Sequence, residues 1–423
     1  MIVIYTPKVT NRIKYTLDFV FQHYFGIVYR ITENQDFVFN DNDIYINYSN
    51  TLIPNTYHIF QYSLLLETTI QAQQPIVSRA TTLPVFFQTT ANYDLPYDIF
   101  SCIFYLISRY EEYLPHEKDV HGRYLSSNSI LSHPDFNFSP IVEYWLLDFK
   151  KILLQLKPTL PFKEYTFAWI STFDIDNAFQ YLGRNWMRRP PNIFKPSVLK
   201  TLFGFKKDNY DILEELIQKL KTNTNQSIFF FLLNNKNKHD SNTDPNYPPL
   251  HQRIKKISRY FDIGIHPSYQ AFQNNTISAE RKKLESISEK EIIYNRQHFL
   301  RIQFPAYFRT LNTLKIQKDF SLCYPDISGF RAGCSRPFLF YDIEQNTATE
   351  LLLQPTCFMD ATYAYYGDFN TDTIHQNLLI QINQVKKING NLVTLFHNDL
   401  LAMKIYEQCF NFLLSDINNN DEI

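Results

Sequence analysis

The chain has 423 residues, a net charge of −1 at pH 7, and contains 44% hydrophobic and 20% charged residues. This length allows two domains, or one large domain with an appendage, and the composition is that of an ordinary globular protein. The nearly neutral charge argues against nucleic acid or a membrane surface as the main partner.

Cysteine usage and the first residues bear on the cellular compartment. The five cysteines are scattered, and no pair has C-x-x-C spacing, which argues against a disulfide framework or a zinc knuckle. Residues 1–7 predict a short strand rather than a signal peptide, because the apolar stretch is short and lacks a basic lead. No run approaches the ~18 apolar residues of a membrane helix. We therefore expect a cytoplasmic protein without a transmembrane segment; the sequence does not indicate its oligomeric state.

The first part of the chain mixes short strands with helices. Apolar residues recur at helical spacing over residues 11–24, 97–113 and 141–156. The third of these helices should end near Pro158 and Pro161, where we place a domain boundary. The sequence thus predicts a smaller α/β N-terminal domain over residues 1–160 and a second domain over residues 161–423.

Strands and helices alternate after Thr166. The predicted strands are 166–173, 227–233, 261–265, one near Leu300, one near 320–324, 329–332 and 391–396. The predicted helices are 211–221, 250–260, 279–291, 306–314, 373–387 and 400–414. Such alternation favours parallel strands covered by helices, in either a barrel or an open sheet.

Two aspartates one residue apart end the first of these strands, in the segment Thr172-Phe173-Asp174-Ile175-Asp176. Side chains alternate along a strand, so Asp174 and Asp176 leave it on the same side. Two carboxylates held together are unfavourable unless a cation or a shared proton separates their charges. The plainer interpretation is a strand end with two solvated aspartates.

Histidines stand at later strand ends or beside them. His266 lies in Gly-Ile-His-Pro-Ser, His298 in Arg-Gln-His-Phe-Leu, and His397 in Leu-Phe-His-Asn. A single such histidine is more often a hydrogen-bonded core residue, but three together with an aspartate pair favour a site. Zinc binds His nitrogen and carboxylate oxygen, so one Asp and two His could hold it, and the remaining carboxylate and histidine could act as base and acid.

Four motifs resemble, in their order, those of the polysaccharide deacetylase family, carbohydrate esterase family four: Thr-Phe-Asp-Ile-Asp, Gly-Ile-His-Pro-Ser, Gly-Phe-Arg-Ala-Gly around Arg331, and Leu-Phe-His-Asn. The resemblance covers roughly residues 165–415, and the first part resembles the extra N-terminal domain of a bacterial subgroup. It implies a distorted (β/α) barrel and a metal-dependent hydrolase that removes N-acetyl groups from an amino-sugar glycan. The implied cofactor is a divalent metal ion, Zn²⁺ first, with Co²⁺ or Ni²⁺ as alternatives.

The resemblance also implies roles for the metal side of the site. Asp176 would bind the metal, and His266 matches the first histidine of the metal-binding motif. Many family members have a second histidine four residues later, where this chain has Gln270. We hypothesise that His298 supplies the missing nitrogen ligand.

On the catalytic side, the resemblance implies that Asp174 is the general base and that Arg331 orients it. His397 would protonate the leaving amine. The resemblance matches Asp360, in Phe-Met-Asp, to the fourth motif of the family. The implied partner is an N-acetylated glycan or a lipid-linked sugar.

A basic segment directly after Asp176 bears on the substrate. Residues 181–207 contain Trp186, Arg188 and Arg189 among seven basic residues and no acidic residue. The segment is either a solvated basic loop or a lid over an anionic glycan or a lipid-linked phosphate sugar, with Trp186 stacked on a ring.

Charged residues also gather in the first domain, at 108–113 and 119–123. We interpret them as interlocking ion pairs that seat this domain on the barrel, and make no catalytic assignment there.

Two alternatives to glycan deacetylation stay open. The chain could remove a formyl or acetyl group from a small nucleotide sugar, or it could be an inactive glycan-binding or scaffold protein.

Overall fold

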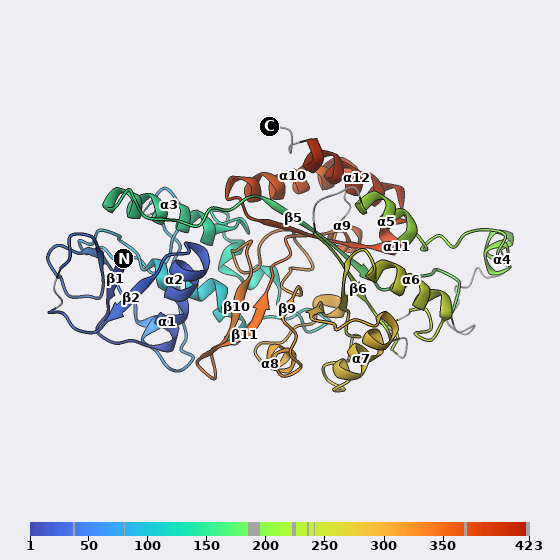
Figure 1. The fold of residues 1–423 in the computed structure, drawn as a ribbon, viewed down its shortest axis with the longest axis horizontal. Helices are drawn as coiled ribbons and strands as arrows, with labels where there is room; N and C mark the ends of the chain where they lie inside the picture. Colours follow the sequence, from blue (N-terminus) through green and yellow to red (C-terminus); the bar gives the residue numbers. More distant parts are fainter. Residues whose placement is uncertain are drawn as a thin grey trace.

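The structure is a computed structural model that describes residues 1–36, 39–79, 81–184, 195–221, 226–234, 237–240, 242–367 and 370–419. The chain has a mixed α/β fold with two sheets. The N-terminal part (residues 1–160) forms one end of an elongated molecule, and the later strand–helix units form the other end (Figure 1). Within the described residues, no helix combines the length and apolar character needed to cross a membrane.

The N-terminal part is built on a parallel four-stranded sheet. Its strands, in spatial order, are β2 (Tyr29–Thr32), β1 (Ile2–Tyr5), β3 (Ile44–Tyr48) and β4 (Tyr57–Ile59). The accompanying helices are α1 (Asn11–Leu17), the π-helix η1 (Asp18–Tyr24), α2 (Ile99–Ile107), α3 (Ile141–Leu156), and the short 3₁₀ helices η2 (Ser63–Leu65), η3 (Tyr110–Tyr113), η4 (Ser126–Asn128) and η5 (Ile130–Ser132). Side-chain caps begin α1 and α2, where Thr10 accepts the N–H of Ile13 and Asp98 that of Ser101.

The second sheet has nine strands, and all neighbours are parallel except the first pair. Its spatial order is β10 (Phe338–Asp342), β11 (Thr347–Leu353), β9 (Lys318–Asp319), β8 (Tyr294–Asn295), β7 (Asp262–Ile265), β6 (Gln226–Phe231), β5 (Ala168–Ile175), β13 (Asn391–His397) and β12 (Phe358–Met359). The helices of this part are α4 (Pro196–Leu202), α5 (Leu213–Lys221), α6 (Pro248–Ser258), α7 (Ile277–Ser288), η7 (His298–Leu300), α8 (Ala306–Thr313), α9 (Asp360–Tyr365), α10 (Thr371–Lys387), α11 (Asn398–Leu401) and α12 (Lys404–Asn419).

An irregular segment between β11 and β12 links the two sides of this sheet. Gln354 N–H donates to the carbonyl of Asp319 (2.8 Å) and Thr356 N–H to that of Leu322 (3.0 Å). Cys357 N–H donates to the carbonyl of Val393 in β13 (3.0 Å). These residues form no strand of their own, yet they hydrogen-bond both to β9 with the segment that follows it and to β13.

Alternation along β5 separates an outer from an inner core. Phe173 and Ile175 belong to the large cluster under the helices, where Phe173 stacks on Phe229 with ring centroids 4.7 Å apart. Ile170 faces inward and packs with Phe230 and neighbouring inward residues. Thr172 and Asp174 share the inner face with Ile170, because side chains on one face of a strand recur every second residue. Asp174 therefore lies on the inner face of the sheet, near the carboxyl end of β5.

Three predictions about strands need correction. Residues 329–332 form a turn, in which Gly329 has φ +139° and a Cβ would lie 2.4 Å from Cβ of Phe138. The strand expected near Leu300 lies earlier, at Tyr294–Asn295, and is followed by the 3₁₀ turn η7. The strand expected near 320–324 lies earlier, at Lys318–Asp319, and the hairpin of β10 and β11 was not predicted.

Buried ion pairs join the N-terminal part to the later part of the chain. Glu112 Oε1 accepts Nε–H groups of both Arg109 and Arg331 (2.9 Å each), and its Oε2 accepts Arg331 Nη2–H (2.6 Å). Arg109 also donates to the carbonyl of Arg331 and pairs with Glu111. All four side chains are buried, and their two positive and two negative charges balance. Charged residues within 108–113 thus attach the N-terminal part to the later part of the chain, which is the role expected for them.

Glu112→Gln should destabilise the protein, because two buried guanidinium groups then lose an anionic partner. Removing one member of a buried ion pair costs about 3–5 kcal/mol. Urea unfolding followed by circular dichroism would measure the change. The exposed Glu407, which pairs with Lys219 at 3.0 Å, provides the control, since Glu407→Gln should cost less than about 1 kcal/mol. Equal stability of the two variants would contradict the seating role.

Candidate metal centre and catalytic pocket

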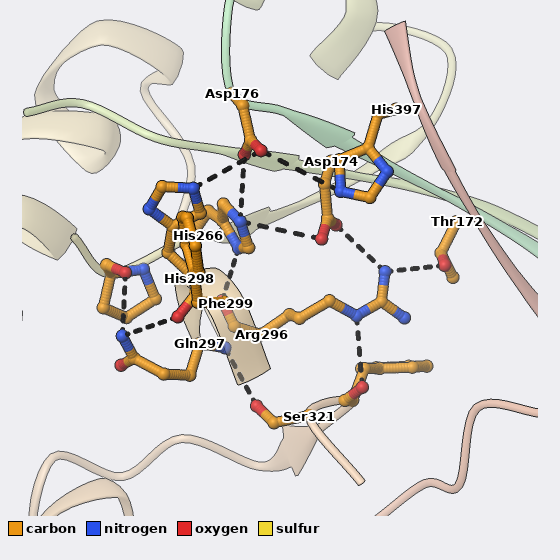
Figure 2. Close-up of polar contacts among 12 residues, drawn as sticks. Thr172, Asp174, Asp176, His266, Arg296, Gln297, His298, Phe299, Ser321 and His397 are labelled. Atoms are coloured by element: carbon orange, nitrogen blue, oxygen red, sulfur yellow. Dashed lines mark hydrogen bonds and ion pairs between the residues drawn. The ribbon is translucent and has the colours of Figure 1, made fainter. Parts of the chain in front are cut away.

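The candidate residues converge because they lie at the carboxyl ends of parallel strands or shortly after them. Asp174 is the penultimate residue of β5, and Asp176 directly follows that strand. His397 ends β13 in register with Asp174. His266 directly follows β7, and His298 lies three residues beyond β8. In parallel sheets these ends meet on one side, and Figure 2 shows the side chains facing one another.

Asp176, His266 and His298 form a compact group. Asp176 Oδ1 lies 3.1 Å from His266 Nε2, and Asp176 Oδ2 lies 3.4 Å from His298 Nε2. One ligand atom from each residue lies within 4.8 Å of the others. Donor atoms about 2.0–2.2 Å from a tetrahedral zinc ion are themselves roughly 3.3–3.6 Å apart. The three donors therefore fit one divalent ion after small adjustments.

The second nitrogen of each imidazole is held by a hydrogen-bond acceptor. His266 Nδ1 lies 2.6 Å from the carbonyl oxygen of Arg296, and His298 Nδ1 lies 2.9 Å from Asp240 Oδ1. These acceptors place the proton on Nδ1, so in a neutral ring Nε2 presents a lone pair to Asp176. Asp176 Oδ1 is buried and has no hydrogen-bond partner among the described residues. A cation between these atoms would satisfy all three.

The shifted pKa values of His298 and Asp176 also favour positive charge at this group. Burial disfavours a charged imidazole, yet Asp176 and then Asp240 outweigh it and raise the pKa of His298 to about 9. Burial of Asp176 is likewise outweighed by His298 and His266, which hold the pKa of its carboxyl well below the usual value. The site therefore attracts positive charge, which either protons or a metal ion can supply.

Arg296, not Arg331, contacts the aspartate expected to act as base. Arg296 Nη1–H donates to Asp174 Oδ1 (3.0 Å) and to Thr172 Oγ1 (2.7 Å), and its Nε–H donates to the carbonyl of Phe320 (3.1 Å). Arg331 instead has its guanidinium on Glu112 and on the carbonyl of Cys323. The expectation that Arg331 orients Asp174 is corrected accordingly.

His397 is fixed by Asp360. Its Nδ1 lies 2.6 Å from Asp360 Oδ1, and its backbone N–H donates to Asp360 Oδ2 (2.7 Å). Nε2 then points toward Asp176, whose Oδ2 is 3.9 Å away. Burial opposes the charged ring, but Asp360, with smaller effects of Asp176 and Asp174, raises the pKa of His397 to about 10. The imidazolium is thus the stable form near neutral pH.

Some expected residues lie elsewhere. Gln270, at the position of the missing histidine, is exposed. Trp186, Arg188 and Arg189 of the proposed lid lie outside the described residues. Sequence reasoning missed Asp240, which stands in an irregular polar stretch, and Arg296, although Arg296 lies two residues before His298 just past a strand end.

The three proposed metal donors, Asp174 and His397 line a pocket of about 400 Å³. Its mouth carries Tyr365 and Tyr366 from the end of α9, which are 71% and 44% exposed. The N-terminal part also reaches this pocket through His121 and Arg123. The other lining residues include Asn177, Leu232, His239, Gln297, Phe299, Leu300, Met359, Ala361, Leu395 and Asp399.

Comparison with protein families identifies only the first part of the chain. Residues 2–158 match the model of a family of unknown function, DUF7033. No curated protein matches the chain.

Solved structures resemble about 60% of the chain. A protein described as a polysaccharide deacetylase from Mycobacterium smegmatis is 13% identical, with 60% of this chain and 85% of that chain covered and a TM-score of 0.41. A polysaccharide deacetylase from Bacillus cereus is 11% identical, with 60% of this chain and 89% of that chain covered and a TM-score of 0.32. A CE4 family pseudoenzyme from Bacillus anthracis is 7% identical, with 60% of this chain and 62% of that chain covered and a TM-score of 0.32. All three TM-scores lie below 0.5, so the chemistry proposed below depends on the side chains of the pocket.

His298→Ala should abolish tight zinc binding, because it removes one of three protein donors. Asp240→Asn should weaken zinc binding about 10–100-fold, since it alters the partner that orients His298. Zinc titration of metal-stripped protein measures both effects. The matched control is His133→Ala, at a side chain that is 46% exposed in the N-terminal part. Full zinc retention by His298→Ala would exclude His298 as a ligand.

Proposed function

We propose that this protein is a divalent-metal hydrolase that removes N-acetyl groups from an amino-sugar glycan. The observation that carries the proposal is the grouping of Asp176, His266 and His298 beside two further ionisable side chains, Asp174 and His397. A three-donor metal site with an adjacent base and acid is the equipment needed for amide hydrolysis.

One carboxylate and two imidazoles are the donor set expected for zinc, and cobalt or nickel would accept the same donors. A bound divalent ion would supply Lewis acidity for the amide carbonyl and lower the pKa of a water molecule. Asp176, His266 and His298 would hold that ion. The backbone carbonyl of Arg296 fixes the His266 imidazole at its Nδ1 atom, and the carboxylate of Asp240 fixes the His298 imidazole in the same way.

Asp174 is placed to accept a proton from the attacking water. Its Oδ1 is bound by Arg296, while Oδ2 lies 3.6 Å from His266 Nε2, on the metal side of the pocket. The hydrogen bond from Arg296 therefore fixes the orientation of the carboxylate and leaves the other oxygen toward the reacting atoms. Thr172 Oγ1 accepts a second hydrogen bond from the same guanidinium.

His397 is placed to donate a proton to the leaving amine. Nδ1 is held by Asp360, so Nε2–H is the group that faces the pocket. Its raised pKa, about 10, keeps the imidazolium charged before the reaction. Loss of this proton to the amine nitrogen lets the C–N bond break without expelling an amide anion.

The substrate assignment has its support at the pocket mouth. Tyr365 and Tyr366 present exposed aromatic rings there, and such rings pack well against the apolar faces of sugars. A lipid-linked amino sugar could present the same ring. A small nucleotide sugar is the second substrate to assay.

Asp174→Asn should lower turnover by about 10²–10⁴-fold, because the amide cannot accept the proton of the attacking water. Zinc content should stay near wild type, since Asp174 is not one of the three proposed donors. Acetate release from N-acetylated glycan oligomers, with zinc measured on the same samples, checks both statements. Unchanged turnover would exclude Asp174 as the base.

Removal of metal by a chelator should abolish acetate release, and added zinc or cobalt should restore it. The assay panel contains glycan oligomers, a lipid-linked amino sugar and a nucleotide sugar. Activity that survives complete metal removal would contradict the proposed chemistry. Bound zinc without acetate release from any of them would support the inactive glycan-binding alternative.

A further inference from the structure

A loop of the N-terminal part forms one wall of the pocket. His121 and Arg123 line the pocket, and Asp119 fixes the loop that carries them. Asp119 Oδ1 accepts the backbone N–H groups of His121 (2.8 Å) and Arg123 (2.9 Å), and its Oδ2 accepts Arg123 Nε–H (2.6 Å). With one carboxylate holding both the backbone and the guanidinium, the loop presents Arg123 in a single orientation.

This loop braces the turn that carries His298. Arg123 Nη1–H donates to the carbonyl of Phe299 (3.2 Å), and Arg301 Nε–H donates back to the carbonyl of His121 (2.9 Å). His121 Nδ1 lies 2.9 Å from the hydroxyl of Tyr269. Three contacts thus tie residues 121–123 to the segments that follow β7 and β8.

The braced turn has a backbone that needs such support. Phe299 and Leu300 have φ values of +60° and +54°, in the left-handed region that side-chain-bearing residues rarely occupy. A conformation of this kind persists only where the surrounding structure imposes it. His298, the proposed third metal donor, immediately precedes these two residues. Support from Arg123 at Phe299 is therefore support for the position of the His298 ring.

The same guanidinium also reaches the mouth of the pocket. Arg123 Nη2–H donates to the hydroxyl of Tyr366, and Arg123 Cζ lies 5.8 Å from the centre of the Tyr366 ring. Tyr366 is 44% exposed, so a large part of its surface is open to a ligand. One residue of the N-terminal part thus contacts both the backbone behind the proposed metal centre and an aromatic ring at the entrance.

We propose that Arg123 is a positioning residue through which the N-terminal part completes the pocket. It holds the His298 turn for metal binding, and it holds Tyr366 as a stacking surface for a pyranose ring. This inference rests on the proposed function. It also gives a role to the region that matches a family of unknown function: that region supplies part of the substrate site.

Two variants separate the two contacts. Arg123→Met removes both, so the dissociation constant for zinc should rise about 10–100-fold, the absorption spectrum of bound Co²⁺ should change, and KM should rise. Tyr366→Phe keeps the ring but loses the hydroxyl, so KM should rise while zinc affinity and the Co²⁺ spectrum stay as in wild type. Arg123→Lys keeps the charge beside Asp119 but cannot reach both partners. It should shift the same quantities in the same direction, and it serves as the test if Arg123→Met does not fold.

Arg79→Met is the matched control, because Arg79 is an exposed arginine of the same part that pairs with Asp135. It should change none of these quantities. Wild-type zinc binding is measured first, and its absence would overturn the proposed function and this inference together. Wild-type zinc binding combined with unaltered zinc affinity, Co²⁺ spectrum and KM in both Arg123 variants would overturn this inference alone.

Discussion

A single electrostatic constraint organises the pocket: two buried imidazoles present Nε2 to one half-buried carboxylate, that of Asp176. The carbonyl of Arg296 and the carboxylate of Asp240 hold Nδ1 of His266 and His298. Asp176 faces both rings and is half-buried, and its Oδ1 is shielded from solvent. Such an arrangement is stable only with positive charge at its centre. The strand ends after β5, β7 and β8 and the loop at Asp240 all contribute to it.

The interior below the pocket supports this constraint. Arg296 bonds Asp174, Thr172 and a backbone carbonyl, and its Cζ lies 4.6 Å from the centre of the Phe230 ring. Gly264 leaves the space for that ring, because a Cβ there would lie 2.5 Å from it. Because Gly264 in β7 has no side chain, the Phe230 ring from β6 fits beside it, and the buried guanidinium of Arg296 lies against that ring. That cation orients the proposed base.

Much of the site was predictable from strand ends, since parallel strands place their carboxyl ends together; Asp174, Asp176, His266, His298 and His397 were named in this way. Asp240 was not, because an irregular polar stretch gives no period from which its direction follows. Arg331 was preferred to Arg296 because a motif was matched, although Arg296 also followed a strand end. The contribution of Arg123 depends on how the two parts pack, which no local pattern in the sequence specifies.

The most direct test is anomalous X-ray diffraction at the zinc absorption edge, measured on crystals of the metal-loaded protein. We predict one strong peak within bonding distance of an Asp176 carboxylate oxygen and of Nε2 of both His266 and His298. Absence of a peak there, or zinc bound only at other residues, would contradict the central claim that these three side chains form a metal centre.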